Sequence, residues 1–369
     1  MHARLWLPAG IAAMTAAAAV LLARKITRVT PTRRREELVA IDHKTVTLAA
    51  TATTRLPGRY ALIDPASAAH AQVGAIIDDD GTHVTRELHA TTGNLTTGPV
   101  RWSGVYHASP NQLGAHRSIT VPTPSGDLVA WIFNESGGEG SWAIHIHGQG
   151  ATPHSALRGV PACARAGLTS LVAPYYGDSS VNGKTPNRTT FGVAEGCDVQ
   201  RAIQLALDAG ARDLVLIGWS LGANVALRLA ATGDVPVRAL VLVDPPLDWR
   251  GVLEHHRQRA RFIPRALLNA ATNILQTPIL HRVGGSPVPI PFHRSFLEQP
   301  MGTDVPVLAI TSAGDRDVPA TQLERFAQLN PNVRIERFPK VPHTMEWNRD
   351  PDRWAAVVAA FCARPSKSQ

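Results

Sequence analysis

Apolar and polar residues alternate with a period of two in several short runs between about residues 40 and 110. Turn-forming pairs such as Pro57-Gly58 and Gly93-Asn94 separate these runs. Alternation bounded by such turns is typical of half-buried strands joined as antiparallel hairpins. The pattern therefore predicts a small β-rich N-terminal extension, which we place at residues 38–115. The expected strands are Thr45 to Leu48, Arg59 to Ile63, Gln72 to Ile77, His83 to Leu88 and Val100 to His107.

The pattern changes in the rest of the chain, where apolar runs alternate with helical stretches from residue 141 onward. This alternation is typical of a mainly parallel sheet with helices on both faces, that is, an α/β domain. A hairpin around Pro124-Ser125-Gly126 is expected to open this domain, which we place at residues 116–363. The expected strands are Trp142 to Ile146, Leu168 to Ala173, Leu214 to Ile217, Leu240 to Val243, Val305 to Ile310 and Val333 to Phe338.

Helices are expected between these strands. In the stretch from Glu195 to Ala209, apolar residues recur at i, i+3, i+4 and i+7, which predicts a crossover helix with one buried stripe. That stripe consists of Val199, Ala202, Ile203 and Ala206. A closing helix is expected from Arg353 to Phe361. Residues 364–369 are polar and are expected to form a disordered tail.

A charged, proline-punctuated insertion interrupts the alternation at about residues 247–303. Its position after a strand of the sheet is where a lid would lie. Four short segments supply apolar surface without an obvious catalytic residue, which favours an acyl-binding lid: Phe262-Ile263-Pro264, Leu267-Leu268, Ile274-Leu275 and Ile279-Leu280. A lid that merely covers the core is the alternative.

The first 37 residues combine an apolar run with a basic cluster. No charged residue lies between Leu5 and Ala23, and a helix of that length would reach about 28 Å, close to the hydrocarbon thickness of a bilayer. We therefore expect a single-pass membrane anchor at residues 1–37, with the catalytic domain on the cytoplasmic side by the positive-inside rule. The alternative is secretion after signal cleavage near Ala17-Ala18-Ala19.

The net charge of +8 is concentrated at the same end of the chain. Residues 1–35 contain seven basic residues and no acidic one, which leaves 30 basic and 29 acidic residues in the remainder. A nearly neutral body excludes an extended basic groove of the kind that binds nucleic acid. The basic cluster is instead expected to face anionic lipid.

The candidate nucleophile is Ser220 in the run Gly218-Trp219-Ser220-Leu221-Gly222. An apolar strand is expected to end at Gly218, and a helix of small residues follows directly. This strand-turn-helix context is the one that a nucleophile elbow requires. A β-carbon at Gly218 or Gly222 would collide with the neighbouring strand or helix, so both glycines have a steric reason.

A serine hydroxyl is a weak nucleophile unless a histidine takes its proton and an acid orients that histidine. His343 follows the last expected strand and is the candidate base. Asp317 follows the expected strand at 305–310 and gives the chain order serine, acid, histidine. Asp315, two residues earlier, and Asp244, at the end of the preceding strand, are the alternative acids.

Attack on an ester creates an oxyanion that needs hydrogen-bond donors placed in advance. The run His147-Gly148-Gln149-Gly150 follows the first apolar strand of the parallel series. We expect the backbone N–H groups of Leu221 and Gln149 to be these donors. His145 and His147 could suggest a metal site, but no further ligand cluster of the right kind follows, so neither a metal nor a cofactor is expected.

Together these motifs resemble the α/β-hydrolase superfamily, because HGxG, GxSxG, GxxD and a late histidine occur in that order across residues 118–362. The likeness is closest to bacterial members with an N-terminal β extension, some similar to lysophospholipases and others to prolyl-oligopeptidase-type hydrolases. One departure is Pro342-His343 in place of the usual Gly-His. The resemblance implies an α/β-hydrolase fold with a lid insertion.

The same resemblance implies a serine hydrolase that cleaves carboxyl esters or thioesters through an acyl-enzyme. The expected partner is a small acyl ester or lipid-like substrate, and the expected activity is that of an esterase or lipase-like enzyme. The alternatives are a peptidase or amidase and a catalytically idle, membrane-anchored binding protein.

Overall fold

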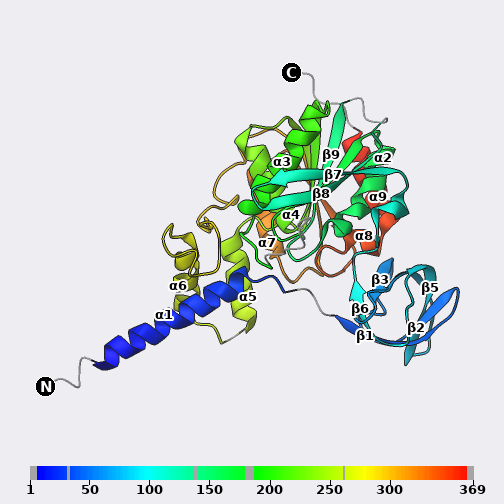
Figure 1. Cartoon of the computed structure of the whole chain (residues 1–369), viewed down its shortest axis with the longest axis horizontal. Coiled ribbons are helices and arrows are strands. Elements are labelled where there is room, and N and C mark those ends of the chain that lie inside the picture. Colours follow the sequence, from blue (N-terminus) through cyan, green and yellow to red (C-terminus); the bar gives the residue numbers. More distant parts are fainter. Residues whose placement is uncertain (1–5, 31–33, 136–139, 179–186, 261, 364–369) are drawn as a thin grey trace.

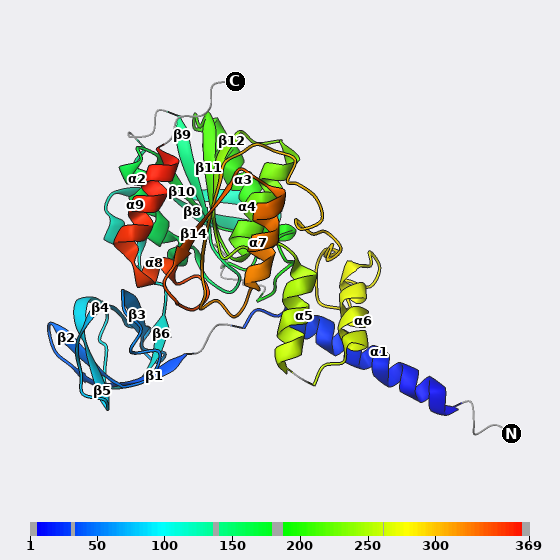
Figure 2. The same ribbon diagram turned by 180° about the vertical axis from the view of Figure 1, so that it is seen from behind.

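An N-terminal helix, a β-barrel, a sheet flanked by helices and a helical insertion make up the chain (Figures 1 and 2). The computed structural model describes residues 6–30, 34–135, 140–178, 187–260 and 262–363. The predicted tail at residues 364–369 lies outside the described residues.

Six antiparallel strands close into a barrel in the order β1-β2-β5-β4-β3-β6. Alternate residues such as Val46, Leu48 and Val84 are fully buried inside it. This alternation is the period-two pattern of the sequence, and the predicted β-rich extension is confirmed. The strands are β1 (Arg35–Ile41), β2 (Thr45–Ala49), β3 (Tyr60–Ile63), β4 (His70–Asp79), β5 (His83–Thr92) and β6 (Gly98–Ser103).

An eight-stranded sheet forms the second domain in the order β14-β13-β12-β11-β9-β10-β8-β7. The pairs β7·β8 and β8·β10 are antiparallel, and the pairs from β10·β9 to β13·β14 are parallel. The predicted mainly parallel sheet is therefore confirmed. The strands are β7 (His116–Thr123), β8 (Gly126–Phe133), β9 (Ser141–Ile146), β10 (Thr169–Ala173), β11 (Asp213–Trp219), β12 (Val237–Val243), β13 (Val307–Ser312) and β14 (Val333–Phe338).

Helices cover both faces of this sheet, and alternate strand residues face opposite helical layers. Ile144 and Leu216 pack in one core with residues of α3 and α4, whereas Val215 packs in another core with residues of α2 and α9. The helices are α2 (Val160–Arg165), α3 (Ala194–Asp208), α4 (Leu221–Thr232), α7 (Ala320–Leu329), α8 (Glu346–Arg349) and α9 (Pro351–Cys362), with short 3₁₀ helices at Pro110–Leu113 and Pro153–Gly159.

The strand order determines where polar loops meet. Strands β9, β11, β12 and β13 are consecutive neighbours and run parallel, so their carboxyl ends lie along one edge of the sheet. In open α/β sheets, ligands bind outside this edge. Strand β14 pairs parallel with β13 and extends this edge, so the loops after these five strands carry the candidate site.

The predicted single-pass membrane anchor is wrong. The helix α1 spans Trp6–Thr27, but among the described residues no helix combines the length and the hydrophobicity needed to cross a bilayer. Alanine is only weakly apolar, and Arg24 and Lys25 occupy the last turn. The membrane partner and the cytoplasmic placement rested on this anchor and are withdrawn with it.

Helix α1 instead packs on the insertion, which contains α5 (Trp249–Ala260) and α6 (Arg265–Gln276) (Figure 1). Ala19, Ala23 and Thr27 recur every four residues and are buried along one stripe of α1. The Arg24 side chain donates a hydrogen bond to the carbonyl of Val283, 2.9 Å away. An apolar stripe that looked like part of a membrane helix is thus a helix-packing stripe.

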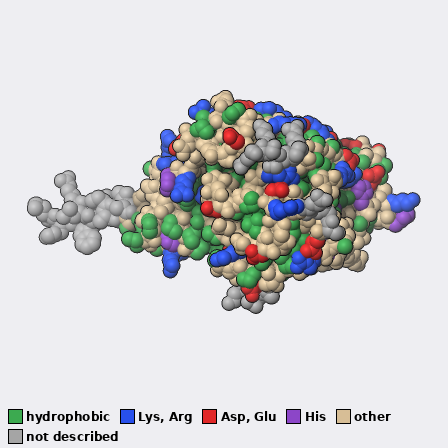
Figure 3. Space-filling view, turned by 90° about the horizontal axis from the view of Figure 1, so that it is seen from above, with side chains coloured by type: hydrophobic (Ala, Val, Ile, Leu, Met, Phe, Trp, Pro, Cys, Tyr) green, Lys and Arg blue, Asp and Glu red, His purple; other side chains and the backbone are tan. Residues whose placement is uncertain are grey.

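The insertion also exposes apolar side chains to solvent. Phe262 is 93% exposed and Ile279 is 84% exposed, whereas Leu268 and Leu275 of α6 are buried. Figure 3 shows hydrophobic side chains at the end of the molecule where α1 and the insertion lie. The apolar residues that favoured an acyl-binding lid are therefore divided between solvent and the protein core.

Candidate active site

Ser220 lies on a sharp turn between β11 and α4. Its backbone has φ of +51° and ψ of −115°, a conformation that L-residues rarely adopt. A β-carbon on Gly218 would lie 2.4 Å from the backbone of Ala223, and one on Gly222 would lie 2.1 Å from the carbonyl oxygen of Ile146. Both positions admit only glycine, and the turn has the geometry of a nucleophile elbow.

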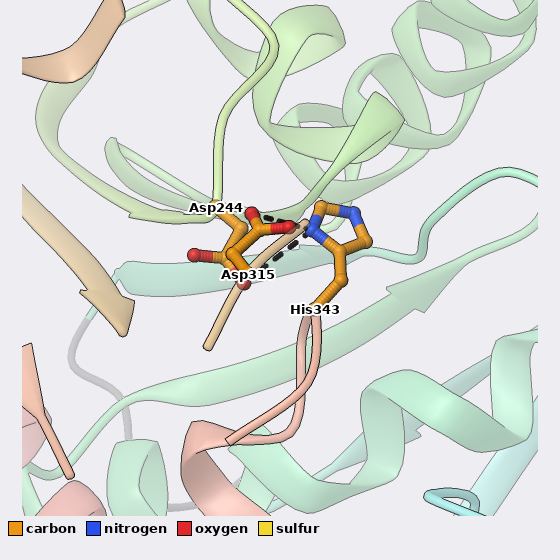
Figure 4. Close-up of side chains that lie close together, drawn as sticks. All are labelled: Asp244, Asp315 and His343. Carbon is orange, nitrogen blue, oxygen red and sulfur yellow. Dashed lines mark hydrogen bonds and ion pairs between the residues drawn. The ribbon is translucent and has the colours of Figure 1, made fainter. Parts of the chain in front are cut away.

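A chain of short hydrogen bonds begins at this serine. His343 Nε2 lies 2.8 Å from Ser220 Oγ, and His343 Nδ1 lies 2.8 Å from Oδ2 of Asp315. Figure 4 shows both Asp315 and Asp244 directed at the same edge of the imidazole. Ser220 follows β11, Asp315 follows β13 and His343 follows β14, so three separate loops converge on one point.

The carboxylate that binds His343 is Asp315 and not the expected Asp317. Strand β13 runs to Ser312, two residues beyond the expected end, and the acidic loop is displaced accordingly. Asp317 is exposed, and its backbone N–H donates to Oδ1 of Asp315 at 2.7 Å. Asp315 is thus held by an Asx turn, in which a side-chain oxygen accepts the N–H two residues on, and Asp317 supplies only backbone to it.

Asp244 is a second carboxylate beside the histidine. Its Oδ2 lies 3.5 Å from His343 Nδ1 and accepts the backbone N–H of Thr344 at 2.7 Å. Asp244 has φ of +46° at the end of β12, and its carboxyl is buried. Burial raises the pKa of Asp244 to about 6.

Glu346 lies behind this pair, and the sequence analysis did not find it. It is completely buried in α8, three residues after His343. Burial, followed by the negative charge of Asp244, raises the pKa of Glu346 well above its usual range. Burial and the charge of Asp244 thus both favour the uncharged form of this side chain.

These carboxylates determine the basicity of His343. Burial disfavours the imidazolium, but the hydrogen bond to Asp315 and the charges of Asp244 and Asp315 outweigh burial and raise the pKa of His343 to about 9. The histidine therefore binds a proton strongly in the free protein.

The HGxG loop is held in place by residues that no motif identified. Tyr175 stacks on the ring of His147 with 3.9 Å between ring centroids, and its hydroxyl donates to the carbonyls of His147 and Gly148. His147 Nε2 lies 3.0 Å from Oδ2 of Asp178. The signal for Tyr175 and Asp178 was their position just after β10, the strand next to β9.

The loop brings two of its residues close to the serine. A β-carbon on Gly148 would lie 3.4 Å from Cβ of Ser220, and Gly150 has φ of +71°. Gln149 is exposed and lines the same cavity as Ser220. Leu221 is the first residue of α4, where backbone N–H groups have no intrahelical partner. The expected oxyanion donors Gln149 and Leu221 thus flank Ser220.

A cavity of about 600 Å³ opens beside Ser220. Its walls come from the barrel, from the HGxG loop and from the loop that follows His343. Trp219 lines it and lies under the guanidinium of Arg158, which is 4.2 Å from the ring centroid. No described residue of the insertion at 247–303 lines this cavity, so the barrel takes the place expected of the lid.

Two groups of side chains deserve consideration as metal ligands. Asp244, Asp315 and His343 each offer one ligand atom within 4.8 Å of the others. Both ring nitrogens of His343 are, however, engaged by Asp315 and Ser220. His145 Nε2 lies 3.0 Å from the hydroxyl of Ser170 and His147 is bound to Asp178, so this pair has other partners.

Comparison with known proteins agrees with this architecture. The chain matches the sequence model of the alpha/beta hydrolase family over residues 143–365, more than half of its length, and residues 37–103 match a domain of unknown function (DUF8805). No curated protein sequence matches the chain significantly.

Similar solved structures support the same alpha/beta hydrolase fold. The esterase Pf2001 of Pyrococcus furiosus superimposes with a TM-score of 0.51 at 18% identity and covers 70% of this chain and 97% of its own. A second crystal form of that esterase gives the same TM-score and identity and covers 95% of its own length. At this identity the likeness concerns the fold alone. The predicted fold and the family match together show that the chain belongs to the alpha/beta hydrolase family.

Proposed function

We propose that the chain is a serine esterase that hydrolyses carboxyl esters through an acyl-enzyme on Ser220. The observation that carries this proposal is the hydrogen-bonded series Ser220, His343 and Asp315, with the serine on a strained elbow. Such a series lets a histidine remove the serine proton while an acid fixes the tautomer of the ring. In this role Asp315 takes the place that the sequence analysis gave to Asp317.

The first half of the reaction follows from the geometry. Ser220 Oγ attacks the ester carbonyl carbon while His343 Nε2 accepts the hydroxyl proton. The negative charge that develops on the carbonyl oxygen is stabilised by the backbone N–H groups of Leu221 and Gln149. The C–O bond to the alcohol then breaks, the imidazolium protonates the leaving oxygen, and the acyl group remains on Ser220.

Water completes the cycle by the same steps. His343 removes a proton from water, the hydroxide attacks the acyl-enzyme, and the carboxylic acid leaves as Ser220 regains its proton. A thioester would react through the same acyl-enzyme, because the acyl half is unchanged. The P. furiosus protein with the same fold is named an esterase, which supports an oxygen ester as the first substrate to test.

The deciding experiment compares the full chain with its Ser220→Ala variant. We expect a fluorophosphonate probe to label the wild-type chain, and we expect Ser220→Ala to lose labelling and to lower kcat on 4-nitrophenyl butyrate by roughly six orders of magnitude. Ser103→Ala removes another hydroxyl that lines the cavity and is the matched control.

Retained labelling or turnover in Ser220→Ala would contradict the proposal. Faster cleavage of peptidyl amides than of esters would favour the peptidase alternative. A wild-type chain that neither reacts with the probe nor turns over any ester would favour the idle binding protein.

A further inference from the structure

The barrel is fixed against the loop that carries His343. The backbone N–H of Arg59 donates to the carbonyl of Asn348 at 2.7 Å, and the Asn348 side chain donates to the carbonyls of Arg59 and Gly104. Asn348 lies in α8, five residues after His343. The wall that the barrel presents to the cavity is therefore held at a fixed position relative to the candidate base.

Two arginines of this wall lie on neighbouring segments of the barrel. Arg101 is on β6, and Arg34 directly precedes β1, the strand paired with β6. The backbone N–H of Trp102 donates to the carbonyl of Arg34 at 2.8 Å, which joins the two positions. Both arginines line the cavity that contains Ser220 and His343.

The lining of the cavity contains more basic than acidic side chains. Among the described residues, Arg34, Arg101 and Arg158 line it, and Asp317 is the one Asp or Glu that does. Within the described part of the chain, Arg34 and Arg101 form no ion pair with an acidic side chain. Burial lowers the pKa of His107 in the same wall to about 4, so this histidine is neutral at pH 7.

We propose that the barrel selects the substrate of the esterase and that Arg34 and Arg101 bind an anionic group, a carboxylate or a phosphate, of the ester. A guanidinium presents N–H donors in a planar fork that matches the oxygens of either group. Arg34 and Arg101 form no ion pair with an acidic side chain of the described residues. They can therefore donate to a substrate anion without first breaking such a pair. This inference rests on the proposed esterase function and names the class of ester.

The opposite assignment, a neutral acyl chain against this wall, fits less well. A neutral chain would leave two guanidinium groups partly desolvated without a partner, and partial desolvation of an unpaired charge is unfavourable. An anionic group replaces the lost hydration and also attracts the substrate over a distance. The barrel then acts in specificity, whereas the loops after β11, β13 and β14 perform the reaction.

The test uses matched pairs of esters and the full chain. The carboxylate pair is 4-nitrophenyl hydrogen adipate and 4-nitrophenyl hexanoate, which share a six-carbon acyl chain. The phosphate pair is 1-hexanoylglycerol 3-phosphate and 1-hexanoylglycerol. We expect the ratio of kcat/KM, charged over neutral, to exceed about ten for at least one pair in the wild-type chain. The pair that shows the preference identifies the anion.

Substitutions of the wall arginines then show which side chains cause the preference for the charged ester. Arg101→Gln and Arg34→Gln should each lower that ratio about tenfold, because each removes one charge-assisted contact. Arg101→Lys should restore part of it, since the charge remains but the fork is lost. Arg35→Gln is the matched control, because Arg35 directly follows Arg34, is exposed and does not line the cavity.

Several outcomes would overturn the inference. Ratios near one in the wild-type chain would do so, as would ratios that Arg101→Gln and Arg34→Gln leave unchanged. If those esters react but show no charge preference, the inference fails while the esterase proposal stands. If no ester reacts, calorimetric binding of 4-nitrophenyl hydrogen adipate to Ser220→Ala decides: binding that Arg101→Gln abolishes supports an anion site, and no binding removes it.

Discussion

Asp315 and Asp317 are separated by one residue but occupy different environments. Asp315 hydrogen-bonds to His343, and Asp317 is exposed. We therefore expect Asp315→Asn to lower kcat on 4-nitrophenyl butyrate by roughly 10⁴, because an amide in this position stabilises the wrong tautomer of the histidine. Asp317→Asn, the matched control, should lower it less than about tenfold. The reverse ranking would return the acid role to Asp317.

The raised pKa of His343 predicts an alkaline pH profile. Only the neutral imidazole can take the proton of Ser220, so kcat/KM should rise with pH until it levels off above about 9. The carboxylates that face the ring are Asp315, Asp244 and, farther out, Asp317. Their negative charges favour the imidazolium and place the rise at high pH.

Asp244→Asn tests the cause of this profile. The substitution removes a negative charge 3.5 Å from His343 Nδ1, so the pKa of the histidine should fall and the rise in kcat/KM should move about one pH unit toward acid. Rate profiles from pH 5 to 10 measure this midpoint. A midpoint that stays where it is in Asp244→Asn, or that moves as far in Asp317→Asn, would show that Asp244 does not control the histidine.

At the scale of single residues, the sequence predicts those site residues whose position follows from local structure. The proximity of Ser220 and His343 could be inferred because a strand-turn-helix motif and the last strand of the sheet define both loops. Asp315 could not be separated from Asp317, because the choice depends on where β13 ends, and pairing of Ser312 with Phe338 of β14 extends that strand. Tyr175 and Asp178 act through contacts with His147 that no local pattern encodes.

At the scale of elements, the barrel is organised around a buried arginine. Arg86 is completely buried, and its guanidinium donates to the carbonyls of Thr54, Leu56, Gly58 and Gly74. Burial lowers the pKa of Arg86 to about 10, which leaves it charged at neutral pH. Arg86 and Val84 are both buried in β5, two positions apart, but such inward positions are usually apolar, so the alternation alone did not identify this residue.

Replacement of Arg86 should therefore destabilise the barrel. Arg86→Leu leaves four buried or partly buried carbonyls without this donor, and we expect the free energy of unfolding to fall by about 3 to 5 kcal/mol. Urea unfolding followed by tryptophan fluorescence measures this change, and Trp102, one of eight tryptophans, lies against Arg86. Arg55→Leu breaks an exposed ion pair with Asp79 and is the control, because exposed ion pairs contribute little to stability. Equal stability of the two variants would rule out this role for Arg86.

At the scale of the whole molecule, most strands of the two β-structures follow from the sequence, because periodicity is a local property. Strand β1 (Arg35–Ile41) was not expected, since its first residues were assigned to the anchor segment at 1–37. How the barrel, the insertion and α1 pack against the rest of the protein does not follow from the sequence. The insertion looked like the wall of the cavity, yet the barrel forms that wall, since contacts of Asn348 dock the barrel beside His343. The helix α1 looked like a bilayer span because its uncharged run is long enough to cross one, but the run is not apolar enough, and α1 packs on α6 instead.

The packing of α1 on the insertion also affects the candidate site. Directly after the helix, the Val29 side chain lies beside Gly150 of the HGxG loop, and the Val29 N–H donates to the carbonyl of Asn187. Arg34 then enters the wall of the cavity. The position of α1 on α6 thus determines how the chain passes the loop that holds the expected oxyanion donor Gln149.

Ala23→Glu should detach α1 from the insertion. Ala23 is fully buried against Gly284 of the insertion, and a carboxylate there would be buried without a partner, so α1 should detach rather than accommodate it. We expect a fall in Tm of several degrees, new proteolytic cleavage within residues 13–30 and a loss of kcat, because Val29 no longer supports Gly150. Ala17→Glu places the same charge on the exposed side of α1 and should change none of these. If Ala23→Glu loses stability but retains full kcat, α1 is a structural element of the insertion with no influence on the HGxG loop.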